Sequence, residues 1–224
     1  MVLRLDASDS DTLYSDQACS SPAVTSGSVV RCWKDISGKG HNATISTGGP
    51  SLVMSSSLLT GNGSEKPAIS FDGSSYLLIS DDTDFDTDSD DFTIVIVTAL
   101  TGTNTTHGLI SKNDGVKRTF QIYKGASNKL LTFEDDNVAT AQVTNAASII
   151  NSTPEYWMFE RDSSQEQTQF YKKSVTDGTT GRTVSVSMVD TTAQIAIGSL
   201  STGSSSPADG DIYFSHRLSG TVSG

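Results

Sequence analysis

The feature that most constrains this chain is a succession of short apolar segments, rich in β-branched and aromatic residues and bounded by Gly, Ser, Asn or Asp. Segments of this kind predict β-strands, and no segment sustains the 3.6-residue period of an amphipathic helix. We expect strands near Val2–Leu5, Val29–Ile36, Ala43–Ile45, Ala68–Phe71, Tyr76–Ser80, Phe92–Leu100, Gly108–Ser111, Thr119–Tyr123, Lys129–Glu134, Ala139–Val143, Glu155–Arg161, Thr168–Lys173, Gln194–Gly198 and Asp211–Phe214. Turns are expected at Ser37–Gly40, Asn62-Gly63, Asp72-Gly73, Asn113–Gly115 and Asp177-Gly178. This pattern indicates an all-β antiparallel sandwich or barrel.

The size and charge of the chain exclude several classes of protein. Its 224 residues suit a single domain over residues 1–224 with a core of its own. The 26 acidic residues outnumber the 15 Lys and Arg, so we expect no nucleic-acid partner. No apolar stretch approaches the roughly 20 residues of a membrane helix, so no membrane insertion is expected. The first twenty residues show no signal peptide, which favours synthesis in the cytoplasm.

The two cysteines leave two interpretations open. Cys19 lies in an expected loop and Cys32 in an expected strand. A disulfide between them would close a short loop and add about 3 kcal/mol of stability. Two free thiols in a reducing cytosol are the alternative.

Several motifs occur in a characteristic order. The run W-x-D-x-S-G-x-G-x-N-A extends from Trp33 to Ala43, F-D-G occupies Phe71–Gly73, and H-R-L-S closes the series at His216–Ser219. Together they resemble the LamG-like jelly-roll domain of the concanavalin A-like lectin/glucanase superfamily. The resemblance covers almost the whole chain and is nearest to versions in bacteriophage virion proteins and secreted bacterial proteins.

This resemblance implies a two-sheet antiparallel jelly-roll sandwich with Trp33 in the core. Asp35 would accept backbone N–H groups in the following turn, so the motif residues are expected to be mainly structural. The alternative is that Asp35, His41 and Asn42 line a binding edge. Tyr123 is a further candidate for ligand contact, because its segment Phe120–Lys124 echoes one fragment of the superfamily's lyases.

An acidic loop is the sharpest local feature. Residues Asp81–Asp91 contain seven aspartates. Alternate members of the run, Asp84, Asp86, Asp88 and Asp90, are candidate ligands for calcium, a hard cation that prefers oxygen. The alternative is a solvated acidic loop that protects the strand after it from edge aggregation. Three widely spaced histidines give no transition-metal motif.

Catalytic signatures are weak. Glu160 and Asp162 have the alternate spacing that glycosidases use, and Glu134–Asp136 forms a second acidic group. Neither resembles the superfamily's hydrolase signature of three acids on one strand. The sequence therefore predicts a chain that is not an enzyme.

The combined hypothesis is a non-catalytic binding module on a virion surface that recognises cell-surface or environmental glycans. It would belong to a phage fibre or a capsid-decoration protein, with other virion proteins and further copies of itself as partners. A purely structural assembly domain and a polysaccharide-degrading enzyme of the same fold are the alternatives. The expected location is the virion surface, after synthesis in the host cytoplasm, with an extracellular location as the alternative.

Overall fold

The computed structural model describes most of the chain. The described residues are 1–45, 49–55, 66–86, 91–101, 105–127, 129–135, 140–144, 154–164, 167–172, 175–181, 191–201 and 206–219. The expected turn at Asn62-Gly63 and the candidate ligands Asp88 and Asp90 lie outside them.

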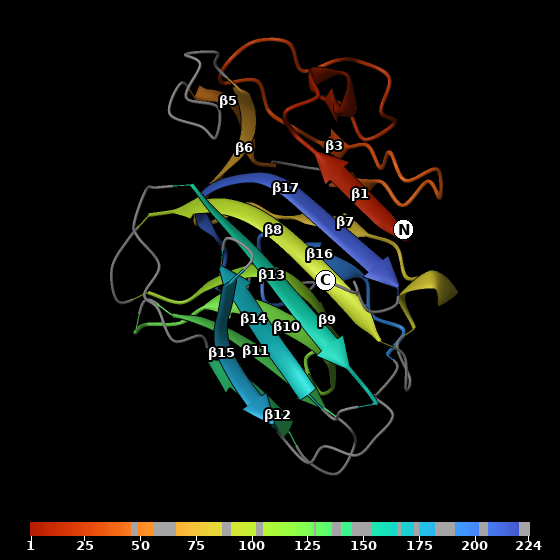
Figure 1. Cartoon of the computed structure of the whole chain (residues 1–224). Coiled ribbons are helices and arrows are strands. Elements are labelled where there is room, and N and C mark those ends of the chain that lie inside the picture. Colours follow the sequence, from red (N-terminus) through yellow and green to blue (C-terminus); the bar gives the residue numbers. More distant parts are fainter. Residues whose placement is uncertain are drawn as a thin grey trace.

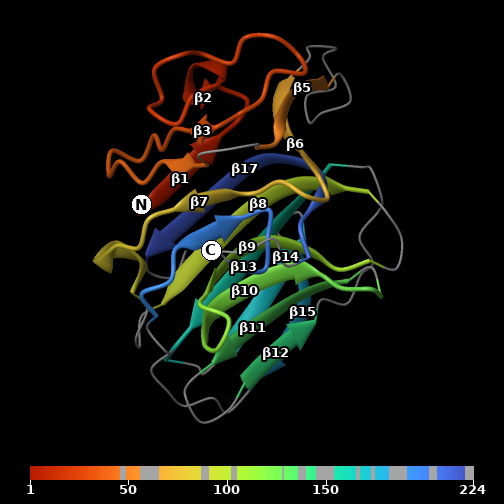
Figure 2. The same ribbon diagram turned by 180° about the vertical axis from the view of Figure 1, so that it is seen from behind.

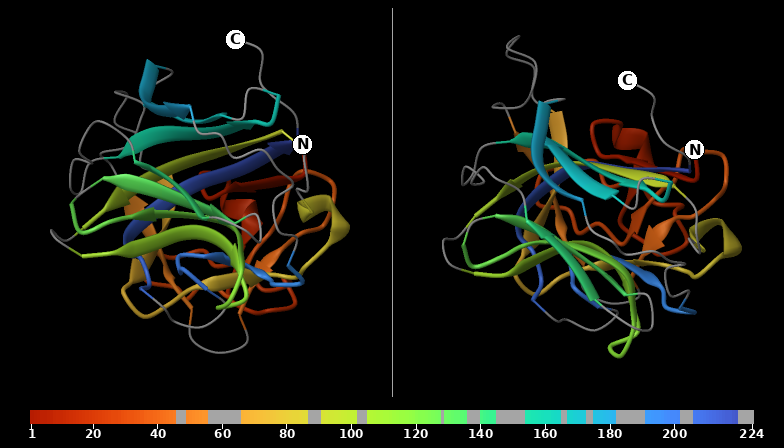
Figure 3. Two further views of the ribbon diagram at one scale, coloured as in Figure 1. Left: turned by 90° about the horizontal axis from the view of Figure 1, so that it is seen from below. Right: turned by 60° about the horizontal axis from the view of Figure 1, so that its bottom comes forward.

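The described strands form two antiparallel sheets that pack face to face (Figures 1–3). The eight-stranded sheet runs in the order β15 (Val175–Gly181), β14 (Gln167–Lys172), β13 (Glu155–Asp162), β8 (Phe92–Leu100), β17 (Asp209–Ser219), β6 (Lys66–Asp72) and β5 (Ser51–Ser55), with β1 (Leu3–Asp6) paired to β17. The nine-stranded sheet runs in the order β12 (Thr140–Thr144), β11 (Leu130–Asp135), β10 (Arg118–Lys124), β9 (His107–Asn113), β16 (Ile195–Ile197), β7 (Leu77–Ile79), β4 (Ala43–Thr44), β3 (Cys32–Trp33) and β2 (Leu13–Tyr14). The predicted all-β, two-sheet antiparallel sandwich is thus confirmed.

Helical structure in the described residues is limited to two short 3-10 turns, η1 (Ser10–Thr12) and η2 (Thr83–Phe85). Within the described ranges, no helix has the length and apolar character needed to cross a membrane.

The core lies between the sheets and is built by strand alternation. Buried and half-buried residues alternate along β13, which turns Trp157 and Phe159 inward. The Phe159 ring centroid lies 5.5 Å from that of Phe170 and 5.8 Å from that of Phe92. Phe92 in turn lies 6.0 Å from Phe120 of the opposite sheet, centroid to centroid. Tilted aromatic pairs at these distances stabilise the contact between the layers.

Strand β8 is central and buried along all nine residues. Ile94 and Ile96 point into the main core, whereas Val97 and Ala99 pack in a smaller cluster on the other face with Tyr213. Two covered faces explain why this strand reads as a nearly continuous apolar run, which made its bounds predictable.

Four local expectations differ from the structure. Residues Val29–Ile36 do not form one strand: only Cys32–Trp33 does, because the backbone groups around it bond to several different segments. Strands β2 and β5 were not expected from their sequences. The Asp177-Gly178 pair, expected to form a turn, lies inside β15, where pairing with β14 overrides the turn preference of the dipeptide.

Cys19 and Cys32 form a disulfide, with Cα atoms 5.5 Å apart, which decides between the two interpretations of the cysteines. The bond fastens the loop after β2 to β3. Next to it, Trp33 is fully buried in the main core, as predicted.

Candidate functional site

Strand register gathers side chains from three neighbouring strands on the outer face of the nine-stranded sheet. In β7, Leu77 and Ile79 point into the core, so Tyr76 and Leu78 point outward. Thr44 of β4 is the Cα partner of Leu78, and partners in register share a face. On the other side of β7, β16 turns Ile195 and Ile197 inward, which leaves the preceding Gln194 outward.

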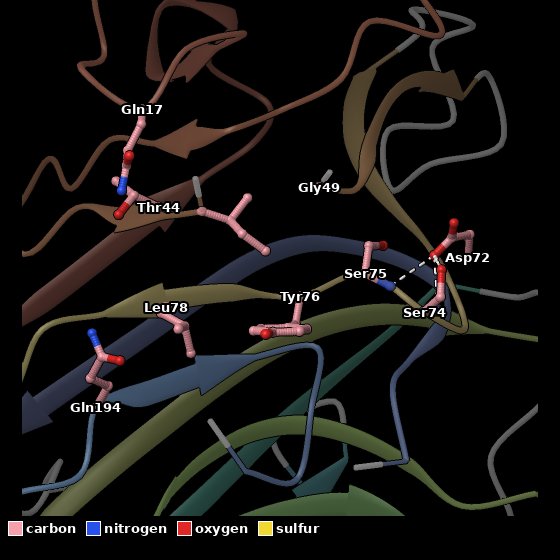
Figure 4. A pocket seen from close by; sticks show the side chains of 10 residues that line it. Gln17, Thr44, Gly49, Asp72, Ser74, Ser75, Tyr76, Leu78 and Gln194 are labelled. Carbon is pink, nitrogen blue, oxygen red and sulfur yellow. Dashed lines mark hydrogen bonds between the residues drawn. The ribbon is translucent and has the colours of Figure 1, made fainter. Parts of the chain in front are cut away.

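These outward residues line a pocket of about 400 Å³, here called the Tyr76 pocket (Figure 4). Its described lining consists of Gln17, Thr44, Ile45, Gly49, Asp72, Ser74, Ser75, Tyr76, Leu78 and Gln194. Two carboxamides, several hydroxyls and an aromatic ring therefore face one cavity. Gly49 contributes backbone with φ +118°, and a Cβ there would lie 2.5 Å from the carbonyl oxygen of Val30.

One end of the Tyr76 pocket is shaped by the Asp72-Gly73 turn, which the structure confirms. Asp72 Oδ1 accepts hydrogen bonds from Ser74 N at 2.9 Å, Ser74 Oγ at 2.8 Å and Ser75 N at 2.9 Å. The side-chain bond from Ser74, together with the other bonds to Ser74 and Ser75, lowers the pKa of Asp72 to about 2. Asp72 is therefore a fixed anion that sets the positions of both serines.

Ser75 is the most deeply placed hydroxyl of this turn. The residue is 7% exposed, and its Oγ makes no hydrogen bond of ordinary length and angle to the described residues, although it lies near enough to Asp72 to contribute to the lowered pKa. The hydroxyl is therefore held beneath the pocket surface, close to the Asp72 carboxylate.

A second pocket of about 370 Å³ adjoins the first, with Thr44 in the wall of both. It contains two of the residues predicted from sequence, His41 and Asn42. Asn42 Oδ1 accepts the N–H of Asp35 at 2.9 Å, and its Nδ2 donates to Cys19 Sγ at 3.6 Å. Asn42 thus links the pocket wall to the disulfide.

Asp35 supports this second pocket from behind. The residue is buried and accepts hydrogen bonds from Arg4 N (2.9 Å), Ser37 N (2.9 Å), Ser37 Oγ (2.7 Å) and His41 N (3.0 Å). Burial raises the pKa of Asp35, but these hydrogen bonds outweigh burial and hold the pKa below its usual value. Both carboxylate oxygens are therefore used in joining β1, the turn and the chain at His41.

A cluster of potential metal ligands lies at the rim of the second pocket. Ligand atoms of His41, Asp82 and Asp84 lie within 4.8 Å of one another. His41 Nε2 is 3.1 Å from Asp84 Oδ2, and Lys39 Nζ is 3.2 Å from the same oxygen. Hydrogen bonds from His41 and then from Lys39 lower the pKa of Asp84. Sequence reasoning missed the role of His41 here because 41 residues separate it from Asp82.

The structure divides the predicted calcium ligands between different partners. Asp84 contacts His41 and Lys39, whereas Asp86 Oδ1 lies 3.0 Å from Lys112 Nζ. The same ammonium lies 3.0 Å from Asp81 Oδ1, and its side chain is fully buried. A lysine thus provides the positive charge between two of the loop carboxylates.

Tyr123 lies in β10, is 9% exposed, and does not belong to the described lining of either pocket. The structure therefore brings together His41 and Asn42, with Asp35 behind them, but not Tyr123. The Tyr76 pocket was not predicted, because it is assembled from five separated segments. The turn at Asp72-Gly73 and the neighbouring Tyr76 were its only signals in the sequence.

Comparisons with known proteins concern the fold. No protein-family model and no curated protein sequence matches the chain. Among solved structures, the binding domain of Paraclostridial Mosquitocidal Protein 1 superposes with a TM-score of 0.67 at 11% identity, covering 85% of this chain and 47% of that one. Trypanosoma rangeli sialidase gives a TM-score of 0.55 at 9% identity, covering 99% of this chain and 30% of that one. The chain thus spans about half the length of the first of these structures and less of the second.

A more distant likeness is to the CBM40 of Ruminococcus gnavus IT-sialidase bound to α2,6 sialyllactose, with a TM-score of 0.48 and 15% identity, covering 66% of this chain and 92% of that one. At such identities the two better superpositions show a shared β-sandwich fold, and function has to be argued from the site.

Proposed function

We propose that this chain is a non-catalytic glycan-binding module and that the Tyr76 pocket is its sugar site. The observation that carries the proposal is the lining of this pocket, in which the Tyr76 ring lies with the carboxamides of Gln17 and Gln194 around one cavity. Ligand pockets combine apolar surface with a few placed polar groups. The Tyr76 pocket has that composition.

The lining chemistry supports a saccharide as ligand. The carboxamides of Gln17 and Gln194 each offer two donors and an acceptor, which suits the adjacent hydroxyls of a sugar. Tyr76 and Leu78 provide apolar surface for the C–H face of a sugar ring. Each contact is weak, so useful binding at a cell surface would come from several copies bound at once.

The carboxylates argue for binding rather than hydrolysis. Glycosidases need two carboxyl groups, one of them with a raised pKa so that it can donate a proton. Asp72 is the one carboxylate in the described lining of the Tyr76 pocket, and its pKa of about 2 keeps it ionised. Glu160, singled out by its spacing to Asp162, accepts the Tyr171 hydroxyl at 2.8 Å on the eight-stranded sheet.

We further propose that the module works outside a cell, on a virion surface or as part of a secreted protein. The Cys19–Cys32 disulfide supports this setting, because disulfides persist in oxidising environments, including virion and cell surfaces. The specific proposal of a phage fibre or capsid-decoration protein rests on the sequence resemblance. Its partners would then be host glycans, other virion proteins and further copies of the chain.

Calcium remains a proposal for the acidic loop. The carboxylates of Asp82 and Asp84 lie together beside His41 and offer oxygen ligands, which calcium prefers. A bound cation would have to compete with Lys39 for Asp84. Its place beside the second pocket would let it order the rim of the site.

A multivalent glycan array tests the proposed function. The chain, displayed on a multimeric carrier, is applied with and without Ca²⁺, alongside the same display of Tyr76→Ala. We expect binding to a defined set of glycans that is lost in the variant. Absence of binding to any glycan would favour a purely structural assembly role instead, and equal binding by the variant would contradict the assignment of the sugar site to the Tyr76 pocket.

A further inference from the structure

The described lining of the Tyr76 pocket carries a negative charge and no basic side chain, and this affects which sugars the pocket can bind. Its described lining contains no Lys, Arg or His, and its one ionisable carboxyl, Asp72, is an anion with a pKa of about 2. Residues 46–48, which connect Ile45 to Gly49 in the chain, are Ser, Thr and Gly and add no cation. The described lining therefore offers no positive charge to an acidic ligand.

From this we infer that the Tyr76 pocket selects uncharged, hydroxyl-rich saccharides over sugars that carry a carboxylate, a sulfate or a phosphate. The inference rests on the proposed glycan-binding function and narrows its ligand class. Proteins that recognise carboxylate or phosphate groups use charge-assisted hydrogen bonds, above all from Arg. A carboxylate in the Tyr76 pocket would meet the Asp72 anion instead, and like charges at short range repel.

The basic side chains in and near the second pocket do not change this conclusion. Lys39 and His41 line the second pocket rather than the first, and both contact the Asp84 carboxylate. Lys112 is fully buried between Asp81 and Asp86. All three groups contact aspartates, and none of them lies in the described lining of the Tyr76 pocket.

The polar groups of the pocket suit an uncharged ligand well. Gln17, Gln194 and Thr44 can each donate and accept, as sugar hydroxyls also do. A neutral sugar can satisfy these groups without bringing in a charge that would need a partner.

The test compares matched neutral and acidic ligands on the full chain. The affinity for lactose is compared with that for α2,3- and α2,6-sialyllactose. The affinity for cellotetraose is compared with that for an oligosaccharide of equal length that ends in glucuronate. Each titration is done at low and at physiological salt. We expect a neutral member to bind and its acidic counterpart to bind at least about tenfold more weakly, with a smaller difference at higher salt because salt screens charge repulsion.

Two variants assign the effect to the pocket. Gln194→Lys places a cation in the lining and is expected to reduce or reverse the preference for neutral ligands. Val116→Lys adds the same charge at a residue that is 85% exposed in a turn outside the lining, and is expected to leave the preference unchanged. Thermal unfolding of both variants checks that they fold.

The outcomes separate the two proposals. Acidic ligands that bind as tightly as neutral ones, with binding lost in Tyr76→Ala, would overturn the preference for uncharged sugars and leave the glycan-binding function standing. Failure of every ligand, neutral and acidic, under multivalent display would overturn both. A preference that Val116→Lys alters as much as Gln194→Lys would show that net charge, and not the pocket, sets it, which also overturns the inference.

Discussion

Thr44 and Leu78 are Cα partners at the junction of β4 and β7. Because of this pairing, the inward-pointing side chains of both strands lie in the core, and the outward-pointing side chains line one cavity. Because side chains on a strand repeat every two residues, a shift by one residue would bury Tyr76 and Leu78 and expose Leu77 and Ile79. The register that builds the core therefore also builds the Tyr76 pocket.

Two substitutions of Tyr76 distinguish the contribution of its ring to glycan affinity from that of its hydroxyl. Tyr76→Ala removes the aromatic surface, and we expect glycan affinity to fall about tenfold or more. Tyr76→Phe keeps the ring and should retain most of the affinity if stacking is the main contribution. Isothermal titration with the best array ligand measures both. Equal loss in the two variants would instead assign the effect to the hydroxyl.

Asp35 gives a prediction on pH. Because hydrogen bonds hold its folded pKa below the usual value of 3.8, the ionised carboxylate contributes stability above about pH 4, and that contribution is lost as the pH falls through the folded pKa. Asp35→Asn should lower the free energy of unfolding by about 2–3 kcal/mol at pH 7 and by less at pH 3. Urea unfolding at both pH values measures this. An equal loss at pH 3 and pH 7 would contradict the assigned role.

The disulfide gives a prediction on redox conditions. Reduction of Cys19–Cys32, which spans a sequence separation of 13, should lower the free energy of unfolding by about 3 kcal/mol. Urea unfolding with and without reductant measures the change, and the Cys19→Ser/Cys32→Ala double variant serves as the control, since reductant should not affect it. An unchanged midpoint for the native chain would show that the bond does not stabilise the fold.

Lys112 gives a prediction on calcium. Lys112→Met removes the ammonium between Asp81 and Asp86 while keeping a side chain of similar length. The loop then carries one more uncompensated negative charge, so we expect Ca²⁺ to raise the melting temperature of the variant more than that of the native chain. Differential scanning fluorimetry with Ca²⁺ and with Mg²⁺ measures this. The same response to Ca²⁺ in both proteins would mean that Lys112 does not compete with a cation.

The strands that could be predicted are those whose own sequence shows a run or an alternation of apolar residues. Phe92–Leu100 was predicted with its observed bounds because both of its faces are buried. In contrast, Ser51–Ser55 has only three apolar residues in a row between two serines, and Val175–Gly181 is polar with two glycines. Both become strands through pairing, with β6 and β14 respectively. Tertiary context decides such segments, and a single sequence does not contain it.

The site was less predictable than the fold. The structural role of Asp35 and the turn at Asp72-Gly73 could be predicted from the sequence, because their hydrogen bonds are mostly local or belong to a motif. The contact of His41 with Asp84 spans 43 residues, and the Tyr76 pocket joins Gln17 to Gln194. Such contacts depend on strand order and register, which no local pattern specifies.

Backbone amide shift mapping tests the central claim most directly. A neutral oligosaccharide selected on the array is titrated into the isotopically labelled chain. We predict that the perturbed amides cluster at the Tyr76 pocket, around Gln17, Thr44, Tyr76 and Gln194. Perturbations centred elsewhere, for example at Tyr123 on β10, would contradict the assignment of the sugar site to this pocket.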